Sequence, residues 1–100
     1  MPSGFVAILS AELHFPEAGS LKGKRQHLRS AKENLRNRFA ASVAEVDHHD
    51  LWQRTTLLIA CAARSAHDAN ELADGAERWL ASGDWVLARC NRLIISPDDE

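Results

Sequence analysis

Two groups of side chains have the residue types that enzymes use for acid–base or metal chemistry. Glu12 and His14 stand two residues apart, so in a strand they would share one face, where a carboxylate beside an imidazole could act as a general base. The run Asp47–Asp50 (DHHD) offers metal-binding atoms, but consecutive side chains do not converge, and no HxxxH or CxxC spacing supports it. We interpret this run as a polar turn. The sequence predicts neither a metal nor a cofactor, and it does not predict an enzyme.

Positive charge is concentrated between residues 22 and 38. Seven Lys and Arg residues against the single acid Glu33 give this segment a charge of +6, whereas the rest of the chain carries five basic and thirteen acidic residues, or −8. At helical spacing five of these cations form one row, which we call the basic stripe: Lys22, Arg25, Arg29, Lys32 and Arg36. Like-charged neighbours destabilise a helix by about 0.2–0.5 kcal/mol per pair, and cations near its start oppose the macrodipole. We therefore expect something to offset this cost.

Three interpretations of the stripe remain open. The backbone of an RNA could bind along it, starting at the free N–H groups after Ser20, and the contacts would be Lys22, Lys24, Arg25, Arg29, Lys32 and Arg36. Such phosphate contacts would give no DNA sequence specificity. Alternatively, acids such as Glu12, Glu17, Asp68, Glu71, Asp74 and Glu77 could neutralise the stripe, within one monomer or across a dimer. Finally, the long stems could cover the edge of the core while their charged ends stay in water.

The elements that must position these residues alternate in type. Alternating or continuous apolar runs predict strands over residues 5–15, 41–47, 55–63 and 85–95, and helical spacing predicts helices over 21–38 and after Ser65 as far as Ser82–Gly83. The order β-α-β-β-α-β indicates an α+β, ferredoxin-like plait: a four-stranded antiparallel sheet with both helices on one face and the first and third strands at its centre. We expect one domain, residues 1–96, followed by an acidic tail, 97–100.

The other sheet face is predicted to be aliphatic. Val6, Ile8 and Ser10 would lie on it, in place of the aromatic side chains on which an RNA recognition motif stacks bases. An open aliphatic face on a small domain favours pairing with a second copy, so we expect a homodimer. The alternative function is therefore a self-associating structural or adaptor domain with no nucleic-acid ligand.

Other features bear on the compartment. The longest wholly apolar run, Leu57–Ala63, is far shorter than the about 20 residues that a membrane span requires. The first residues have no basic segment typical of a secretory signal. We expect a cytoplasmic protein that does not bind membranes. Cys61 and Cys90 lie in strand-like apolar runs, which predicts small buried side chains and not a redox pair.

The segment Trp52-Gln53-Arg54 has two interpretations. In the structural one, Leu51 and Trp52 fold back on the end of the sheet while Arg54 pairs with Glu45 or Asp47. In the functional one, the Trp52 ring stacks on an unpaired nucleotide, and Gln53 and Arg54 bond to it.

Two stretches of the sequence resemble a known family. The run from Ser42 to His48 (SVAEVDH), leading into Asp50–Arg54 (DLWQR), and the weaker match at Ser20–Arg25 (SLKGKR) are similar to the YlxP-like family of small bacterial proteins, also called domain-of-unknown-function family 503. The resemblance covers nearly the whole chain and implies a ferredoxin-like fold, with no established activity. It also implies a link to RNA or the ribosome, because genes of this family often lie beside translation genes. The recurrent positions would be Ser20, Leu21, Lys22, Lys24, Arg25, Glu45, Asp50, Trp52, Gln53 and Arg54. Gly23 departs from the family, where an acidic residue is usual.

Overall fold

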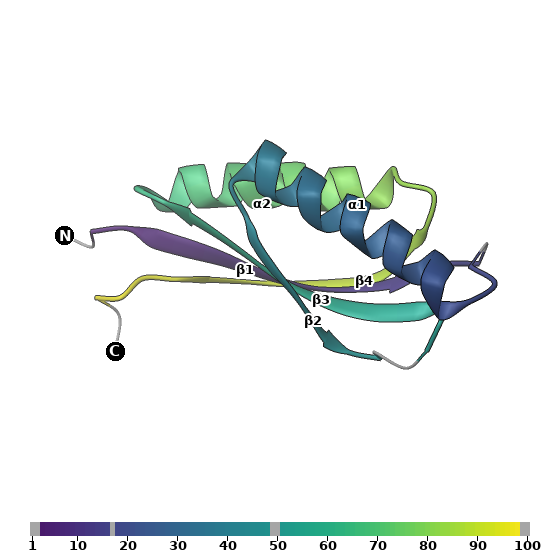
Figure 1. The fold of residues 1–100 in the computed structure, drawn as a ribbon. Coiled ribbons are helices and arrows are strands. Elements are labelled where there is room, and N and C mark those ends of the chain that lie inside the picture. The colour runs from purple at the N-terminus through teal and green to yellow at the C-terminus, as the bar shows by residue number, and fades with distance from the viewer. Residues whose placement is uncertain (1–2, 17, 49–50, 99–100) are drawn as a thin grey trace.

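The computed structural model describes residues 3–16, 18–48 and 51–98. The elements follow in the predicted order: β1 (Phe5–His14), α1 (Leu21–Phe39), β2 (Ser42–Asp47), β3 (Arg54–Ala63), α2 (Ala66–Ala81) and β4 (Val86–Ile95) (Figure 1). The boundaries of the strands and of α1 differ from the predicted ones by a single residue.

Both helices begin at a serine that caps them, as the sequence indicates. The Gly23 amide donates to Ser20 Oγ at 3.1 Å, and the Asp68 amide donates to Ser65 Oγ at 3.0 Å. The first turn of α1 contains no acidic residue. The helix ends at Ala40, whose φ of 51° lies in the left-handed region.

The sheet is antiparallel throughout, with the strand order β2-β3-β1-β4. The prediction that β1 and β3 are the central strands is therefore confirmed. Two irregularities adjust the register: β4 has one extra residue, Ala88, opposite the step from Glu12 to Leu13, and β2 has one extra residue, Val46. After the bulge at Ala88, Arg92 is the register partner of Leu9 in β1. Its side chain lies on the sheet face that α2 covers, and its guanidinium is 2.8 Å from the Asp74 carboxylate.

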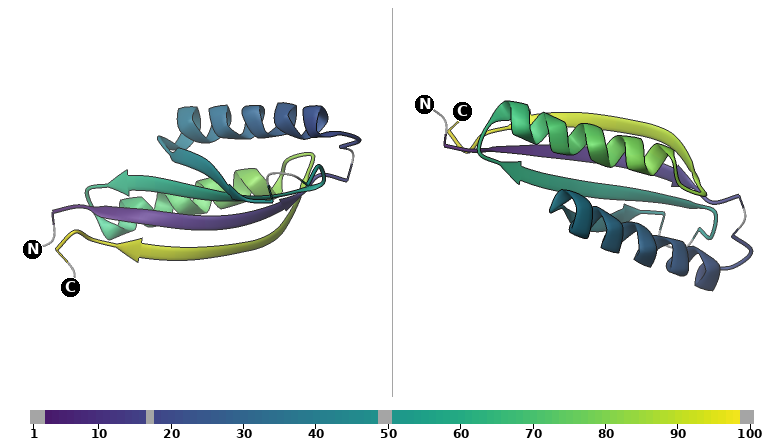
Figure 2. Two further views of the ribbon diagram at one scale, coloured as in Figure 1. Left: turned by 60° about the horizontal axis from the view of Figure 1, so that its bottom comes forward. Right: turned by 90° about the horizontal axis from the view of Figure 1, so that it is seen from above.

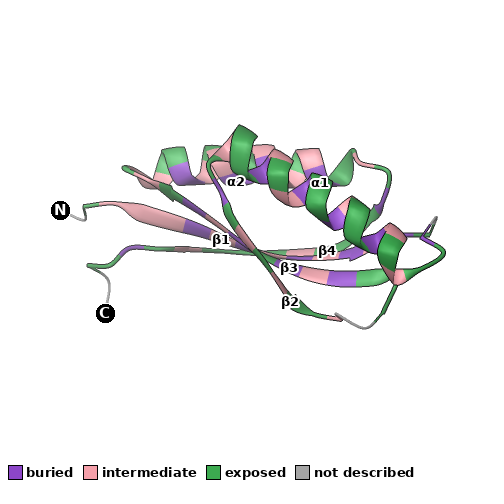
Figure 3. Cartoon of the chain, in the orientation of Figure 1, coloured by how far each residue is buried: buried purple, intermediate pink, exposed green. Residues whose placement is uncertain are grey.

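Both helices lie on one side of the sheet, as predicted (Figures 1 and 2). Helix α2 packs on β1, β3 and β4, whereas α1 lies along the β2 edge and against α2. The two helices approach closely at Gly75, where an added Cβ would lie only 2.7 Å from the Phe39 ring. The core between the layers consists mainly of fully buried side chains from β1, β3 and the inner faces of the helices (Figure 3): Ala7, Leu9, Ala11, Leu13, Leu57, Ile59, Leu35, Ala73 and Leu80.

The opposite sheet face is open and largely aliphatic, as the alternation in β1 predicts. The register places Ile8 beside Leu93 and Val6 beside Ile95, and Leu58 lies opposite Ser10. Leu93 is 57% exposed, Leu58 41% and Ile95 40%. We call these residues the open face: Val6, Ile8, Leu58, Leu93 and Ile95.

The two ends of the described chain lie side by side (Figure 1), where the Ser3 amide donates to the Asp98 carboxylate at 2.7 Å. The last two residues of the predicted acidic tail, Asp99 and Glu100, lie outside the described residues. Cys61 is buried and Cys90 partly so, and both are free thiols. Neither helix in the described parts of the chain is long and apolar enough to pass through a membrane.

Candidate nucleic-acid interface

The basic stripe lies on the solvent side of α1. Leu28, Ala31 and Leu35 are buried beneath the helix, and four of the five stripe residues are exposed, with Lys32 half-buried. At a rise of about 1.5 Å per residue, the stripe extends for about 21 Å along the helix axis. That length lets it contact several consecutive phosphates of one strand.

The stripe cations have no carboxylate partners within the described part of the chain. No acidic oxygen there lies within 4.0 Å of their charged groups, and several of the acids that could neutralise them have other partners. Glu12 pairs with Arg54, and both Asp74 and Glu77 pair with Arg92. Neutralisation of the stripe within one monomer is therefore wrong for these acids; Glu17 lies outside the described residues.

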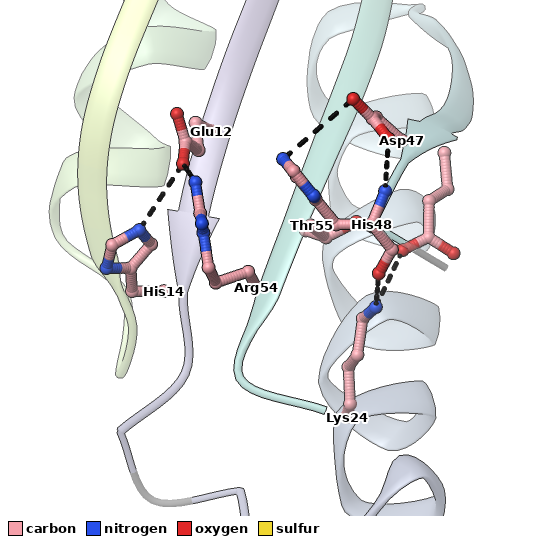
Figure 4. Close-up of polar contacts among 8 residues, drawn as sticks. Glu12, His14, Lys24, Asp47, His48, Arg54 and Thr55 are labelled. Carbon is pink, nitrogen blue, oxygen red and sulfur yellow. Dashed lines mark hydrogen bonds and ion pairs between the residues drawn. The ribbon is translucent and has the colours of Figure 1, made fainter. Parts of the chain in front are cut away.

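Lys24 is the exception among the predicted phosphate contacts. Its side chain is only 1% exposed, and its ammonium lies 3.0 Å from Glu45 Oε2 and donates to the His48 carbonyl oxygen at 2.6 Å (Figure 4). The same Glu45 oxygen accepts a hydrogen bond from the Thr55 hydroxyl. The prediction that Lys24 contacts phosphate is therefore wrong: Lys24 ties α1 to β2 and is not accessible to a ligand.

A pocket of about 490 Å³ opens at the end of the sheet where β1 ends and β3 and β4 begin. The residues that line it come from the end of β1, the segment into β3 and the start of β4: His14, Pro16, Leu51, Trp52, Gln53, Arg54 and Val86. The structure thus joins two candidates that the sequence presented separately, His14 and the Trp52-Gln53-Arg54 segment.

Trp52 does not pack into the core. It is 50% exposed and Leu51 is 45% exposed, so the predicted folding back of these residues on the sheet is not observed. A tryptophan side chain can bury about 200 Å², so half exposure leaves about 100 Å² in contact with water. Burying that area would contribute about 2.5 kcal/mol to the free energy of unfolding. The backbone of the loop is nevertheless held in place, because the Phe15 amide donates to the Gln53 carbonyl oxygen at 2.8 Å.

Arg54 is anchored by Glu12, and not by Glu45 or Asp47 as the structural interpretation expects. Its guanidinium donates to Glu12 Oε1, and the same oxygen lies 3.5 Å from His14 Nε2, so that the ring and the guanidinium flank one carboxylate (Figure 4). The hydrogen bond from Arg54 holds the pKa of Glu12 below its usual range, against the opposing effect of burial, and His14 lowers it further. Glu12 is thus a charged anchor for Arg54 and a poor proton acceptor.

The polar turn gives no support for a metal site. Within residues 3–16, 18–48 and 51–98, no three His, Cys, Asp or Glu side chains converge as metal ligands do. His49 and Asp50, which belong to that turn, lie outside the described residues.

Comparison with known proteins places the chain in a family. The family model "Protein of unknown function (DUF503)" matches residues 6–90. The chain belongs to this family. The uncharacterized protein YlxP of Bacillus subtilis (strain 168) is 41% identical over 49 residues, which cover 49% of this chain and 53% of that protein. The match therefore spans about half the length of that DUF503 relative.

One solved structure supports the fold of this DUF503 chain. A proposed antibiotic biosynthesis monooxygenase from Nitrosomonas europaea superposes with a TM-score of 0.50 at 14% identity, covering 98% of this chain and 93% of that one. A protein with the same description from Bacillus cereus gives a TM-score of 0.47 at 12% identity, covering 98% and 96%. At such identities the likeness to the first of these shows the fold alone.

The positions that carry the resemblance to DUF503 proteins divide into two groups. Ser20, Lys24, Glu45 and Arg54 make hydrogen bonds or ion pairs to other parts of the fold, although Ser20 and Arg54 are also exposed. Lys22, Arg25, Trp52 and Gln53 are exposed. Leu21 is half-buried, and Asp50 lies outside the described residues. The second group, at the α1 start and in the pocket, is available to a ligand, and so are the unbonded N–H groups of Arg54 in the pocket.

The buried position of Lys24 and the partner of Arg54 both have signals in the sequence. Lys24 falls between Leu21 and Leu28 at the spacing of the apolar stripe, which indicates a position beneath the helix. Pairing β1 antiparallel to β3 also brings Arg54 opposite His14, so that the Glu12 carboxylate comes within reach of the guanidinium.

Proposed function

We propose that this protein binds RNA through the basic stripe of α1. The observation that carries the proposal is the row of five cations along one helix, none paired with a carboxylate within the described residues. A polyanion could neutralise all five cations at once, because its phosphates follow one another along a strand. The stripe residues follow one another along the helix in the same way.

The start of α1 strengthens this proposal. Lys22 and Arg25 stand in or next to the first turn, where no acid compensates them and where the helix macrodipole itself attracts anions. Without a ligand these cations oppose both the dipole and one another. A phosphate bound there would remove both effects.

The experiment is a salt series of RNA binding, measured as the fluorescence anisotropy of a short labelled single strand. Contacts with three to five phosphates would give log affinity a slope of about −2 to −4 against log salt concentration. The double variant Arg25→Glu/Arg29→Glu should lose more than about tenfold in affinity, or about 1.4 kcal/mol, and keep the wild-type thermal stability within about 1 kcal/mol.

A matched control has the same net charge. Arg64→Glu/Arg78→Glu also changes two exposed arginines away from the stripe, so both variants go from −2 to −6 (two changes of −2 each). The control should bind RNA far better than the stripe variant. Equal losses in the two variants, or an affinity that does not respond to salt, would overturn the proposal.

A second candidate function, self-association, is favoured by the open face. Three strands of ten residues and one of six, about 4.8 Å apart, present a surface of about 570 Å² per molecule. Two copies that meet through it would bury about 1,140 Å², close to the lower end of stable interfaces. Leu93 and Leu58 stand out from it into solvent, and large apolar patches of this kind are uncommon on monomers.

Sedimentation measurements test this second candidate. If two copies pair through the open face, Leu93→Glu should shift the protein to monomer, while Leu51→Glu, at another exposed leucine that lies in the pocket, should leave the dimer intact. A wild-type protein that sediments as a monomer at high concentration contradicts the candidate.

A further inference from the structure

We propose that the pocket at the end of the sheet binds one unpaired nucleobase, so that RNA held along the basic stripe must be single-stranded where it reaches the pocket. This inference rests on the proposed function and adds to it the kind of RNA that is bound. It concerns a different surface, the one formed by His14, Trp52, Gln53, Arg54 and their neighbours.

The size and composition of the pocket fit a small planar ligand. Its volume of about 490 Å³ lies within the range of small-molecule sites, roughly 300–1,000 Å³. Trp52 supplies a half-exposed aromatic ring, and Leu51 and Val86 supply exposed apolar walls. Every base has a flat π-face that stacks on an indole, so an apolar, ring-lined pocket open to solvent suits a base that has left its helix.

The polar groups of the pocket fit the edge of a base. The Gln53 side chain is exposed, and its amide can both donate and accept, as the Watson–Crick edge of a base requires. Arg54 has further N–H donors beyond the one bonded to Glu12, and that bond fixes the direction of its side chain (Figure 4). Because Glu12 already balances the charge of Arg54, the pocket is suited to a neutral base more than to a second phosphate.

A short stretch of chain connects the pocket to the start of the stripe. Pro16 lines the pocket, and only a short segment of chain separates it from Ser20, the cap of α1. The hydrogen bond from the Phe15 amide to the Gln53 carbonyl oxygen links the pocket loop to that segment. In this proposal, a strand with phosphates at Lys22 and Arg25 continues past the start of α1, and its next nucleotides reach the pocket. Paired bases would stay inside their duplex and could not enter it.

The test compares a short single-stranded RNA with the duplex of the same sequence at one salt concentration. The wild-type protein should prefer the single strand, and Trp52→Ala should weaken that complex by about 5- to 100-fold, the range measured for loss of one base–aromatic stack. Trp52→Phe, which keeps a ring, should lose less. Duplex affinity and the salt slope should not change, whereas the stripe variant Arg25→Glu/Arg29→Glu should weaken both complexes.

Controls separate failure of the pocket from failure of the proposed function. Val46→Ala removes a comparably exposed apolar side chain on β2, outside the pocket and the open face, and should bind as the wild type does. Equal affinity for both RNAs, with Trp52→Ala indistinguishable from Val46→Ala, would overturn the pocket proposal and leave the stripe proposal standing.

A second measurement decides the pocket even if RNA does not bind. Adenosine carries a base without phosphate, and its titration should quench tryptophan fluorescence saturably in the wild type but not in Trp52→Phe. Absence of saturable quenching would overturn the pocket as a base site. RNA that fails to bind at low salt would overturn the stripe proposal alone.

Discussion

The Lys24 ammonium lies 3.0 Å from the Glu45 carboxylate and is buried by it, although Lys22 and Arg25 on the same turn stand in solvent. One lysine of the basic segment thus holds the fold together, and its neighbours are left for a ligand. The position of each around the helix decides which role it has.

Removing the buried lysine should strongly destabilise the protein. Lys24→Met leaves Glu45 in a site that is only 17% exposed, and breaking a buried pair from one side costs about 3–5 kcal/mol. Urea unfolding should show this loss, whereas Lys22→Met on the exposed stripe should change stability by less than about 0.5 kcal/mol. The double variant Lys24→Met/Glu45→Leu should recover part of the loss. Equal effects of the two single variants would contradict the structural role.

The Glu12–Arg54 pair should stabilise the protein in a pH-dependent way. Because Arg54 holds the pKa of Glu12 below the ordinary 4.5, the stabilisation is fully present above pH 4.5 and is lost as pH falls through the folded-state pKa. Glu12→Gln should therefore lower the thermal unfolding temperature well above pH 4.5 and have little effect well below it. A difference from wild type that stays constant with pH would contradict this account.

The two thiols should be unreactive in the folded protein. Burial, together with the Glu77 carboxylate beside it, raises the pKa of Cys90 to about 12, and burial also raises the pKa of Cys61. Thiolate is scarce at neutral pH, so iodoacetamide should alkylate neither residue until urea unfolds the chain. Rapid alkylation of Cys90 in the native protein would contradict the raised pKa and the partial burial of this thiol.

The end of α1 offers a stabilising substitution. Ala40 adopts a φ of 51°, a conformation that costs an alanine about 1 kcal/mol and a glycine almost nothing. Ala40→Gly should therefore raise the free energy of unfolding by about 0.5–1 kcal/mol in urea titrations, after allowance for the greater freedom of glycine in the unfolded chain. The matched change Ala41→Gly, in the buried residue beside it, should lower stability.

The start of α1 offers the reverse substitution. An added Cβ at Gly23 would meet only Ser20 Oγ, at an ordinary contact distance of 3.6 Å, so alanine fits without strain. Gly23→Ala should stabilise the protein by about 0.5–1 kcal/mol. Gly75→Ala is the contrasting case, because its Cβ would lie 2.7 Å from the Phe39 ring, and thermal unfolding should show little or no gain there.

The sequence predicts the fold well because its signals are local. The alternation in β1 and the serine caps at Ser20 and Ser65 each specify an element without knowledge of the rest of the chain, and the order of the elements then leaves few topologies. The basic stripe can be predicted in the same way, because helical periodicity is also a local signal.

The pocket could not be predicted in the same way, because strand register brings its parts together. His14, Arg54 and Val86 are far apart in the sequence and meet only once β1 is paired on both sides, with a bulge setting the offset of β4. The prediction for Lys24 is wrong because it is based on residue type, since a lysine in a basic segment is expected to be exposed. The helical spacing of Lys24 instead places it on the buried face with Leu28 and Leu35.

The extra residue Ala88 also bears on how molecules behave beside one another. In the described sheet β4 is an outer strand, and a straight outer strand is a template on which the same strand of another molecule can align and start a fibre. A bulge kinks and twists that edge, and the exposed Arg89 next to it adds a positive charge at the edge. The bulge that directs Arg92 toward α2 thus also disfavours edge-to-edge pairing between the sheets of different molecules.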